Sequence, residues 1–328
     1  MKKLIKILGI IFFVVVVIIA GILIYFNASY PNVPPANQIT IKPSPERIAR
    51  GAYLAEHVTL CIDCHSQRDY SKFGGPIIAG TYGKGGELFG KENMGLPGNL
   101  YSSNITPTGI SEWSDGDLLR AMTQGVTKDN RALFPIMPYP NFNHLSQEDA
   151  YSIITYIRSL KPIENNVPKS ELDFPLNLIV KTMPLETYNP SPAPDKSDPA
   201  AYGKYLTTLA SCNECHTPSV KGEPVQGMLF AGGMMFNMPA GIVKSANLTP
   251  DKETGIGYWT KESFIQRFKI VDSDSAKNIP VTMDQFNTPM PWLQYSGMTE
   301  EDLGAIYEYL RTQNPVTNLV VKFTPEKK

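Results

Sequence analysis

Two copies of the pattern Cys-x-x-Cys-His hold all four cysteines of this chain of 328 residues. Cysteines at this spacing can reach the two vinyl groups of one porphyrin, and the histidine that follows can bind the iron below the ring. The sequence therefore predicts two covalently bound haem c groups. Their attachment and iron-binding residues are Cys61, Cys64 and His65 in the first motif and Cys212, Cys215 and His216 in the second.

Two other uses of paired cysteines fit the spacing less well. A zinc ribbon places its two Cys-x-x-Cys pairs about 15 to 20 residues apart, whereas Cys61 and Cys212 lie in opposite halves of this chain. A thiol–disulfide redox motif does not require the histidine that follows each pair. No cysteine remains outside the motifs for a disulfide or for an axial ligand.

An uncharged apolar run at residues 7–26 follows three lysines near the amino terminus. As a helix it would be about 30 Å long, which matches the hydrocarbon thickness of a bilayer. We expect residues 1–27 to be a cytoplasmic end and an uncleaved transmembrane signal anchor, although the small residues 27–29 leave cleavage open. The lysines predict a single pass of the bacterial inner membrane, with everything after Phe26 on the periplasmic side.

The net charge of −1 gives no large field of one sign, so we expect no nucleic-acid partner. The rest of the chain divides by composition and by motif. We expect a tether at 28–43, a first cytochrome c domain at 44–164, a proline-rich linker at 165–197, a second domain at 198–316 and a tail at 317–328. The linker contains apolar residues, so we expect it to pack along a domain surface or to bridge the domains.

The second half of the chain repeats the order of motifs in the first half. The corresponding segments are Asn104-Ile105-Thr106-Pro107 and Asn247-Leu248-Thr249-Pro250, Trp113 and Trp259, and Met137-Pro138 and Met290-Pro291. Each half opens with a helix, capped by Ser44 or Asp198, that contains Gly51 or Gly203. Each half closes with a helix, capped by Ser146 or Thr299, that contains Tyr156 or Tyr309. We expect each glycine to contact its tyrosine where these helices cross. The glycine-rich stretch 74–98 predicts an irregular surface loop.

Met137 and Met290 are the candidates for the sixth iron ligand, because a thioether closes the site that an open iron would leave for substrates. Both occupy the repeat, each precedes a proline, and both lie on stretches without a helical pattern. His57 is too close to Cys61 to reach the opposite face of the same haem, and His144 is expected at the surface. Weaker candidates are Met94 and Met235.

Two further pairs of residues have alternative uses that the sequence leaves open. Trp113 and Trp259 either donate an indole N–H to a haem propionate or fill the core beside the porphyrin. Asn104 and Asn247 either hold a loop over the haem edge by hydrogen bonds or only mark a turn.

With these motifs the sequence resembles the membrane-anchored, two-domain class I c-type cytochromes. It is most similar to the cytochrome c subunits of bacterial quinoprotein and flavoprotein dehydrogenases that oxidise alcohols or sugars. The resemblance covers about residues 44–160 and 198–312, and it also includes Thr254-Gly255-Ile256-Gly257 before Tyr258-Trp259. Those subunits commonly have three haem domains, whereas this chain has two motifs.

The resemblance implies an all-α fold, with two tandem cytochrome c domains after the transmembrane helix. It implies iron ligation by His65 with Met137 and by His216 with Met290. It also implies an electron carrier without catalytic residues, which takes electrons from an outer-face dehydrogenase and passes them to a terminal oxidase, a soluble cytochrome or a quinone-linked acceptor. The alternatives are a dihaem redox enzyme of the peroxidase or thiosulfate dehydrogenase type, with one open or differently ligated iron, and a haem sensor for diatomic gases.

Overall fold

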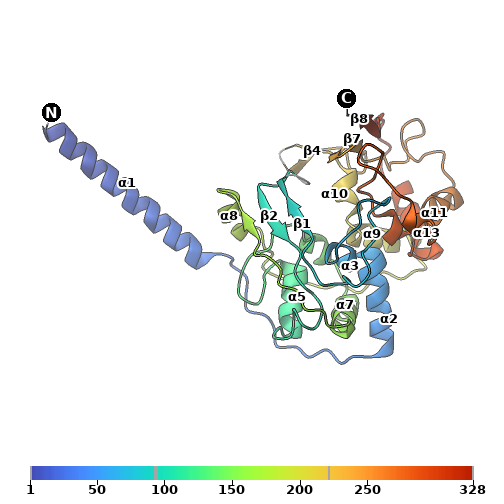
Figure 1. The fold of residues 1–328 in the computed structure, drawn as a ribbon, viewed down its shortest axis with the longest axis horizontal. Coiled ribbons are helices and arrows are strands. Elements are labelled where there is room, and N and C mark those ends of the chain that lie inside the picture. The colour runs from blue at the N-terminus through green and yellow to red at the C-terminus, as the bar shows by residue number, and fades with distance from the viewer. Residues whose placement is uncertain (1, 92–94, 221, 327–328) are drawn as a thin grey trace.

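A computed structural model describes residues 2–91, 95–220 and 222–326. A single long helix, α1 (Lys2–Ser29), projects from a globular body that holds the remaining elements (Figure 1). None of its residues is buried against the body. Its 28 residues are long and apolar enough to cross a membrane, a property that a signal sequence shares. This agrees with a membrane anchor at the amino end.

The first half of the body, residues 44–164, is built around two crossing helices, α2 (Pro45–Tyr53) and α7 (Gln147–Ser159). The predicted cap of α2 is confirmed, because the Ser44 side chain accepts a hydrogen bond from the backbone N–H of Arg47. A Cβ at Gly51 would clash with the Ser152 carbonyl oxygen and would lie 2.7 Å from Cβ of Tyr156. The predicted contact between Gly51 and Tyr156 is therefore confirmed. Among the described residues, this half also contains η1 (Leu54–Val58), α3 (Cys61–Cys64), α5 (Asp115–Gln124) and α6 (Tyr139–Phe142).

The second half, residues 198–316, has a matching pair of helices, α9 (Pro199–Leu209) and α13 (Glu300–Arg311). Gly203 marks their crossing, but the atoms nearest to its Cβ position belong to the backbone of Ala305 and Ile306. The closest approach here is therefore to the backbone of α13, and none of the three nearest atoms belongs to Tyr309. The other helices of this half are α10 (Cys212–His216), α11 (Lys261–Lys269), η3 (Ala276–Asn278) and α12 (Trp292–Tyr295).

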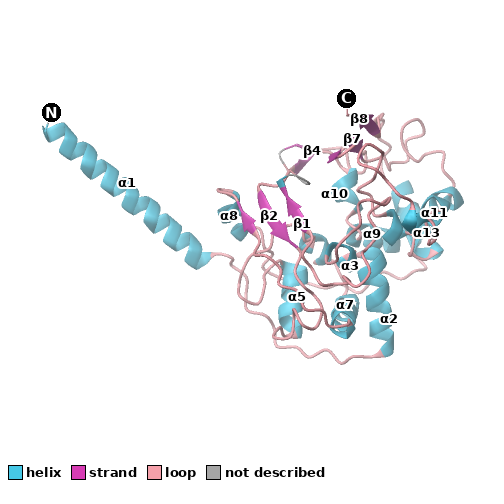
Figure 2. Ribbon diagram, in the orientation of Figure 1, coloured by secondary structure: helices cyan, strands magenta, loops and turns pink. Residues whose placement is uncertain are grey.

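The prediction of an all-α fold is wrong, because the part of the chain that the structure describes contains three small antiparallel sheets besides the helices (Figure 2). One sheet has the order β1-β2-β3, the second pairs β4 with β5, and the third has the order β6-β7-β8. The strands are β1 (Leu88–Gly90), β2 (Gly98–Tyr101), β3 (Glu171–Leu172), β4 (Ser219–Val220), β5 (Glu223–Pro224), β6 (Met235–Met238), β7 (Gly241–Lys244) and β8 (Phe323–Pro325).

These strands have a common physical cause. The segments that follow each haem motif are too irregular for helix, so their backbone polar groups find partners by short strand pairing. The predicted irregular loop at 74–98 contains β1 and the beginning of β2, and β3 of the linker completes that sheet. In the second half, β8 in the tail pairs with β7. The strands are two to four residues long, which is too short for an alternating pattern to reveal them.

The linker and the tether both lie on the first half. Besides β3, the linker forms α8 (Leu176–Ile179) and η2 (Val180–Thr182). The Tyr188 hydroxyl donates to the Leu145 carbonyl oxygen at 2.9 Å, so this end of the linker is bonded to the first half. Of the apolar linker residues, Val180 is buried, whereas Phe174 and Ile179 are exposed. In the tether, the Ile41 N–H donates to the Asp115 carboxylate at 2.8 Å. Residues 28–43 are therefore fixed to α5 along part of their length.

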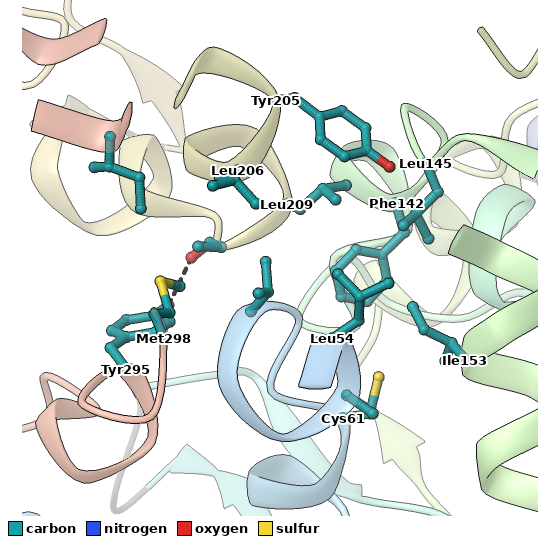
Figure 3. Close-up of a cluster of buried hydrophobic side chains, with 14 of the residues drawn as sticks. Leu54, Cys61, Phe142, Leu145, Ile153, Tyr205, Leu206, Leu209, Tyr295 and Met298 are labelled. Atoms are coloured by element: carbon teal, nitrogen blue, oxygen red, sulfur yellow. Dashed lines mark hydrogen bonds between the residues drawn. The ribbon is translucent and has the colours of Figure 1, made fainter. Parts of the chain in front are cut away.

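The two halves share one hydrophobic cluster, to which α9 contributes Leu206 and Leu209, and η1 and α6 contribute Leu54 and Phe142 (Figure 3). Tyr205 points from α9 toward the first half in the same view. The cluster runs without a break from one half to the other. The halves therefore pack as one body.

Two reciprocal polar contacts border this cluster. The Tyr205 hydroxyl donates to Asp149 at 2.7 Å and accepts from the N–H of Ser146, the cap of α7, at 3.0 Å. On the other side, the Tyr53 hydroxyl donates to Asp302 at 2.6 Å and accepts from the N–H of the α13 cap at 3.2 Å. In each case a tyrosine of one half bonds to an aspartate and a helix cap of the other half. The two halves therefore contact each other through equivalent surfaces, as the two subunits of a twofold homodimer do.

Candidate haem sites

Both Cys-x-x-Cys-His motifs begin in the same local backbone conformation. Leu60, with φ of 54°, precedes α3, and Ser211, with φ of 53°, precedes α10. A left-handed residue reverses the chain direction and lets a new helical turn start at the first cysteine. Within one such turn, residues three apart lie on the same side. Each motif therefore presents its two thiols to the same side of the chain.

The thiols fit covalent attachment better than thiol redox chemistry. All four cysteines are free. Cys61 is only 7% exposed, and burial raises its pKa to about 11. Burial likewise raises the pKa of Cys64 to about 12. Reactive thiols need a lowered pKa and positively charged surroundings, so these cysteines are poor redox nucleophiles.

Each motif histidine is oriented by a backbone carbonyl. His65 Nδ1 lies 2.7 Å from the Ser103 carbonyl oxygen, and His216 Nδ1 lies 2.7 Å from that of Ala246. A carbonyl oxygen only accepts, so Nδ1 carries the proton and Nε2 keeps its lone pair for a metal. Burial lowers the pKa of both histidines, which favours the neutral, ligating form. This is the arrangement that a haem iron requires of its proximal ligand.

The asparagine turns fix the two carbonyls. The Asn104 side-chain oxygen accepts from the Thr106 N–H at 2.9 Å, and its amide donates to the Ile163 carbonyl at 2.8 Å. Asn247 makes the corresponding bonds to Thr249 and Val316 at 2.9 and 2.8 Å. These residues therefore do more than mark a turn, because they hold the loop whose preceding carbonyl orients each histidine.

Two glycines that sequence reasoning missed close the same loops. The Gly85 N–H donates to the His65 carbonyl at 2.8 Å, and the Gly232 N–H donates to that of His216 at 2.7 Å. Both have positive φ, and a Cβ at Gly85 would lie 2.5 Å from the Ser103 carbonyl carbon. Only glycine fits so close to another backbone. The signal was present as a Gly-Gly pair in each half, at residues 85–86 and 232–233.

Met137 and Met290 lie in equivalent local structures. Each is outside a helix and half-buried against the hydrophobic cluster. Each is followed by a proline that caps a four-residue helix, α6 after Pro138 and α12 after Pro291. The predicted non-helical setting of both methionines is confirmed.

The helix after each methionine contacts the cysteine motif of the opposite half. The Asn141 amide of α6 donates to the Ser211 hydroxyl at 2.9 Å, immediately before Cys212. In return, the Gln294 amide of α12 donates to the buried carboxylate of Asp63, inside the first motif, at 2.5 Å. The two motifs therefore lie against a shared boundary between the halves.

Tyr295 lies at this boundary between the cysteines of both motifs. It is 6% exposed, and its hydroxyl donates to the Ala210 carbonyl at 2.7 Å. Burial raises its pKa well above the ordinary value, and the nearby Cys212, Cys215 and Cys64 raise it further. Tyr295 is therefore close to both motifs.

The remaining candidates fall outside the motifs. His57 is half-buried, and its Nδ1 lies 2.9 Å from the Gln294 carbonyl oxygen, so it joins the two halves. His144 is exposed, as predicted. Met235 is 63% exposed on β6, which makes it a poor ligand, and Met94 lies outside the described residues.

Trp113 and Trp259 are both half-buried and pack against the hydrophobic cluster. Their backbone carbonyls accept hydrogen bonds from Arg158 and Tyr307 respectively. These bonds fix the chain at the two tryptophans. The choice between a propionate contact and core packing stays open for both rings.

Several known proteins with similar sequences are cytochrome subunits of bacterial dehydrogenases. The chain is 29% identical over 286 residues to the fructose dehydrogenase cytochrome subunit of Gluconobacter japonicus, which covers 81% of this chain and 52% of that one. It is 28% identical over 284 residues to the gluconate 2-dehydrogenase cytochrome c subunit of Pantoea cypripedii, covering 81% and 59%. The chain is homologous to cytochrome c subunits of bacterial dehydrogenases.

A diheme cytochrome c-type protein of Cereibacter sphaeroides is 27% identical over 201 residues, which is 58% of this chain and 64% of that protein. No family model matches the chain. The chain spans a little over half the length of the two dehydrogenase subunits. Those relatives are named as cytochrome subunits rather than catalytic subunits, which agrees with an electron-transfer role and with covalently bound haem c.

Proposed function

We propose that this protein is a dihaem c-type cytochrome that carries single electrons. The observation that supports this most strongly is the matched pair of sites, each with free cysteines and a histidine held by a backbone carbonyl at 2.7 Å. Haem c, when bound, supplies an iron that accepts and donates one electron. The chain contributes ligation, burial and orientation.

We assign the ligands of each site within one half of the chain. In the first site, Cys61 and Cys64 would hold the haem by thioether bonds, and His65 and Met137 would bind its iron. Cys212, Cys215, His216 and Met290 have these roles in the second site. Trp113 and Trp259 lie beside the two porphyrins in this proposal. A methionine thioether on each iron would leave no open position for a substrate, and this favours a carrier over an enzyme with an open iron.

The contacts between the halves support electron exchange inside one molecule. Asn141 and Gln294 each bond the short helix after one methionine to the opposite cysteine motif, and Tyr295 is buried at the same boundary. With its two sites on either side of this boundary, one chain can accept an electron at one surface and release it at another.

We further propose a place for the molecule. It is tethered by α1 to the bacterial inner membrane in a single pass, with the body on the periplasmic side. Its electron donor would be an outer-face dehydrogenase, as the names of its relatives suggest. Its acceptor would be a terminal oxidase, a soluble cytochrome or a quinone-linked protein.

Near-infrared absorption and magnetic circular dichroism of the oxidised full chain test this proposal. The wild type should show methionine–iron charge transfer from two haems, and Met137→Ala and Met290→Ala should each remove one contribution. Met283→Ala is the matched control, because Met283 is 74% exposed and should leave the spectrum unchanged. A high-spin or bis-histidine haem in the wild type, or turnover of peroxide or thiosulfate by the isolated protein, would refute the carrier function. One haem per chain in a pyridine haemochrome assay would refute the count of two.

A further inference from the structure

An apolar turn of the linker is exposed on the body. Phe174 is 77% exposed and Ile179 is 46% exposed, at the start and the end of the segment that forms α8. Large apolar side chains gathered at a surface usually mark a site of protein or membrane contact. Residues 174–179 are called the α8 turn.

The α8 turn lies next to the end of the membrane anchor. The Lys181 ammonium contacts the side-chain oxygen of Asn27, one residue after the apolar run of α1 ends. The Asn32 amide donates to Glu186 at 3.3 Å in the same region. Figure 1 shows α8 on the side of the body that faces α1, beside the carboxy-terminal end of that helix. With residues 7–26 inside the bilayer, Asn27 lies at the bilayer surface. The α8 turn, which is beside Asn27, then lies near the same surface.

The α8 turn is also held firmly to the first half. The Asp173 N–H donates to the Pro97 carbonyl at 3.1 Å, and β3, immediately before it, pairs with β2. Val180, immediately after it, is only 7% exposed. A contact made by Phe174 and Ile179 therefore fixes the orientation of the body and not only that of a loose loop.

We propose that the α8 turn inserts Phe174 and Ile179 into the boundary between headgroups and acyl chains of the bilayer that α1 crosses. This rests on the membrane tether proposed above. Phenylalanine and isoleucine partition into that region when their backbone is held at its level. The exposed carboxylates of Glu171 and Asp173 border the turn, so the insertion is shallow. The first half then has two attachments to the membrane and presents a fixed face to it.

Photo-crosslinking in nanodiscs of phosphatidylethanolamine and phosphatidylglycerol tests this inference. In separate full-length variants, p-benzoylphenylalanine replaces Phe174, Phe13 of α1, or Tyr258, and adducts are identified by mass spectrometry. Phe13 is the positive control for the anchor. Tyr258, which is 76% exposed on the second half, is the matched aqueous control. All three side chains are exposed, so the replacements leave the core intact.

Lipid adducts from positions 174 and 13, with none from 258, are the expected result. A lipid adduct from position 13 alone would overturn the inference and leave the tether in place. An adduct from position 174 to protein would show that this face binds a protein partner and would likewise overturn it. If position 13 gives no lipid adduct, the tether itself fails and the inference falls with it.

Discussion

Tyr205→Phe tests whether the reciprocal contacts between the halves stabilise the body. The substitution removes only the hydroxyl, which donates to the buried Asp149 carboxylate at 2.7 Å and accepts from the Ser146 N–H at 3.0 Å. A hydrogen bond to a charged group contributes about 1.5–3 kcal/mol, and a neutral one contributes about 1 kcal/mol. Arg50 still donates to Asp149 at 2.8 and 3.0 Å, so the carboxylate is not left unpaired.

We therefore expect Tyr205→Phe to lower the free energy of unfolding by about 2–3 kcal/mol. A loss of ~2 kcal/mol is about a 30-fold change in the folding equilibrium, since 1.4 kcal/mol is tenfold. With an m-value of about 3 kcal/mol per M urea, the midpoint of unfolding would fall by about 0.7 M. Because one cluster spans both halves, the transition should remain single and cooperative.

Urea titration of the full chain in detergent, followed by far-ultraviolet circular dichroism, measures this change. Tyr258→Phe is the control, because this exposed tyrosine should shift the free energy by no more than about 0.5 kcal/mol. Equal midpoints for the two variants would refute the assigned role of the Tyr205 hydroxyl. Two separate transitions in the wild type would show that the halves unfold independently.

Two further predictions concern the loops and the ion pairs. Gly85→Ala and Gly232→Ala should each destabilise the fold by about 1–3 kcal/mol and lower haem incorporation, because a Cβ would strike the loop that orients the histidine; the haem-to-protein ratio and thermal unfolding check this. Arg47 donates to Glu148 at 2.6 and 2.9 Å, and these bonds lower the pKa of Glu148 below 4.5. The folded state then binds that proton more weakly than the unfolded state, so the pair stabilises the protein above pH 4.5 and loses its effect as the pH falls through the lowered pKa. Between pH 6 and pH 3, Glu148→Gln should reduce the loss of unfolding free energy by about 0.2–1 kcal/mol, as measured by urea unfolding at each pH; an unchanged loss would contradict the assignment.

The sequence predicted the parts of the site that depend on neighbouring residues. The cysteine–histidine spacing, the methionine–proline loops and the helix caps at Ser44, Ser146 and Thr299 are local patterns, and the structure has the expected capping bonds. The role of Gly85 was not predicted, because its constraint comes from a backbone that approaches it from residues 102–104. Such a contact is not encoded in any short window of sequence.

The strands and the interface were missed for a related reason. A strand such as Glu171–Leu172 exists only because Gly98 and Asn99 are placed beside it by the rest of the fold. The pairing of Tyr53 with Asp302 likewise joins residues that belong to opposite halves. Aligning the chain with itself compares each residue with its counterpart. It cannot show that a residue of one half, such as Tyr53, bonds to a residue of the other half, such as Asp302.

Each candidate site depends on a hydrogen bond from the opposite half of the chain. Gln294, in the second half, completes the hydrogen bonding of Asp63 within the first motif, and Asn141 does the same beside the second. A natural substitution at either residue would adjust the electrostatic surroundings of a centre that its own half does not hold. Separating the two halves would break both of these contacts at once. The two halves therefore form one structural unit, although the sequence repeats like two separate ones.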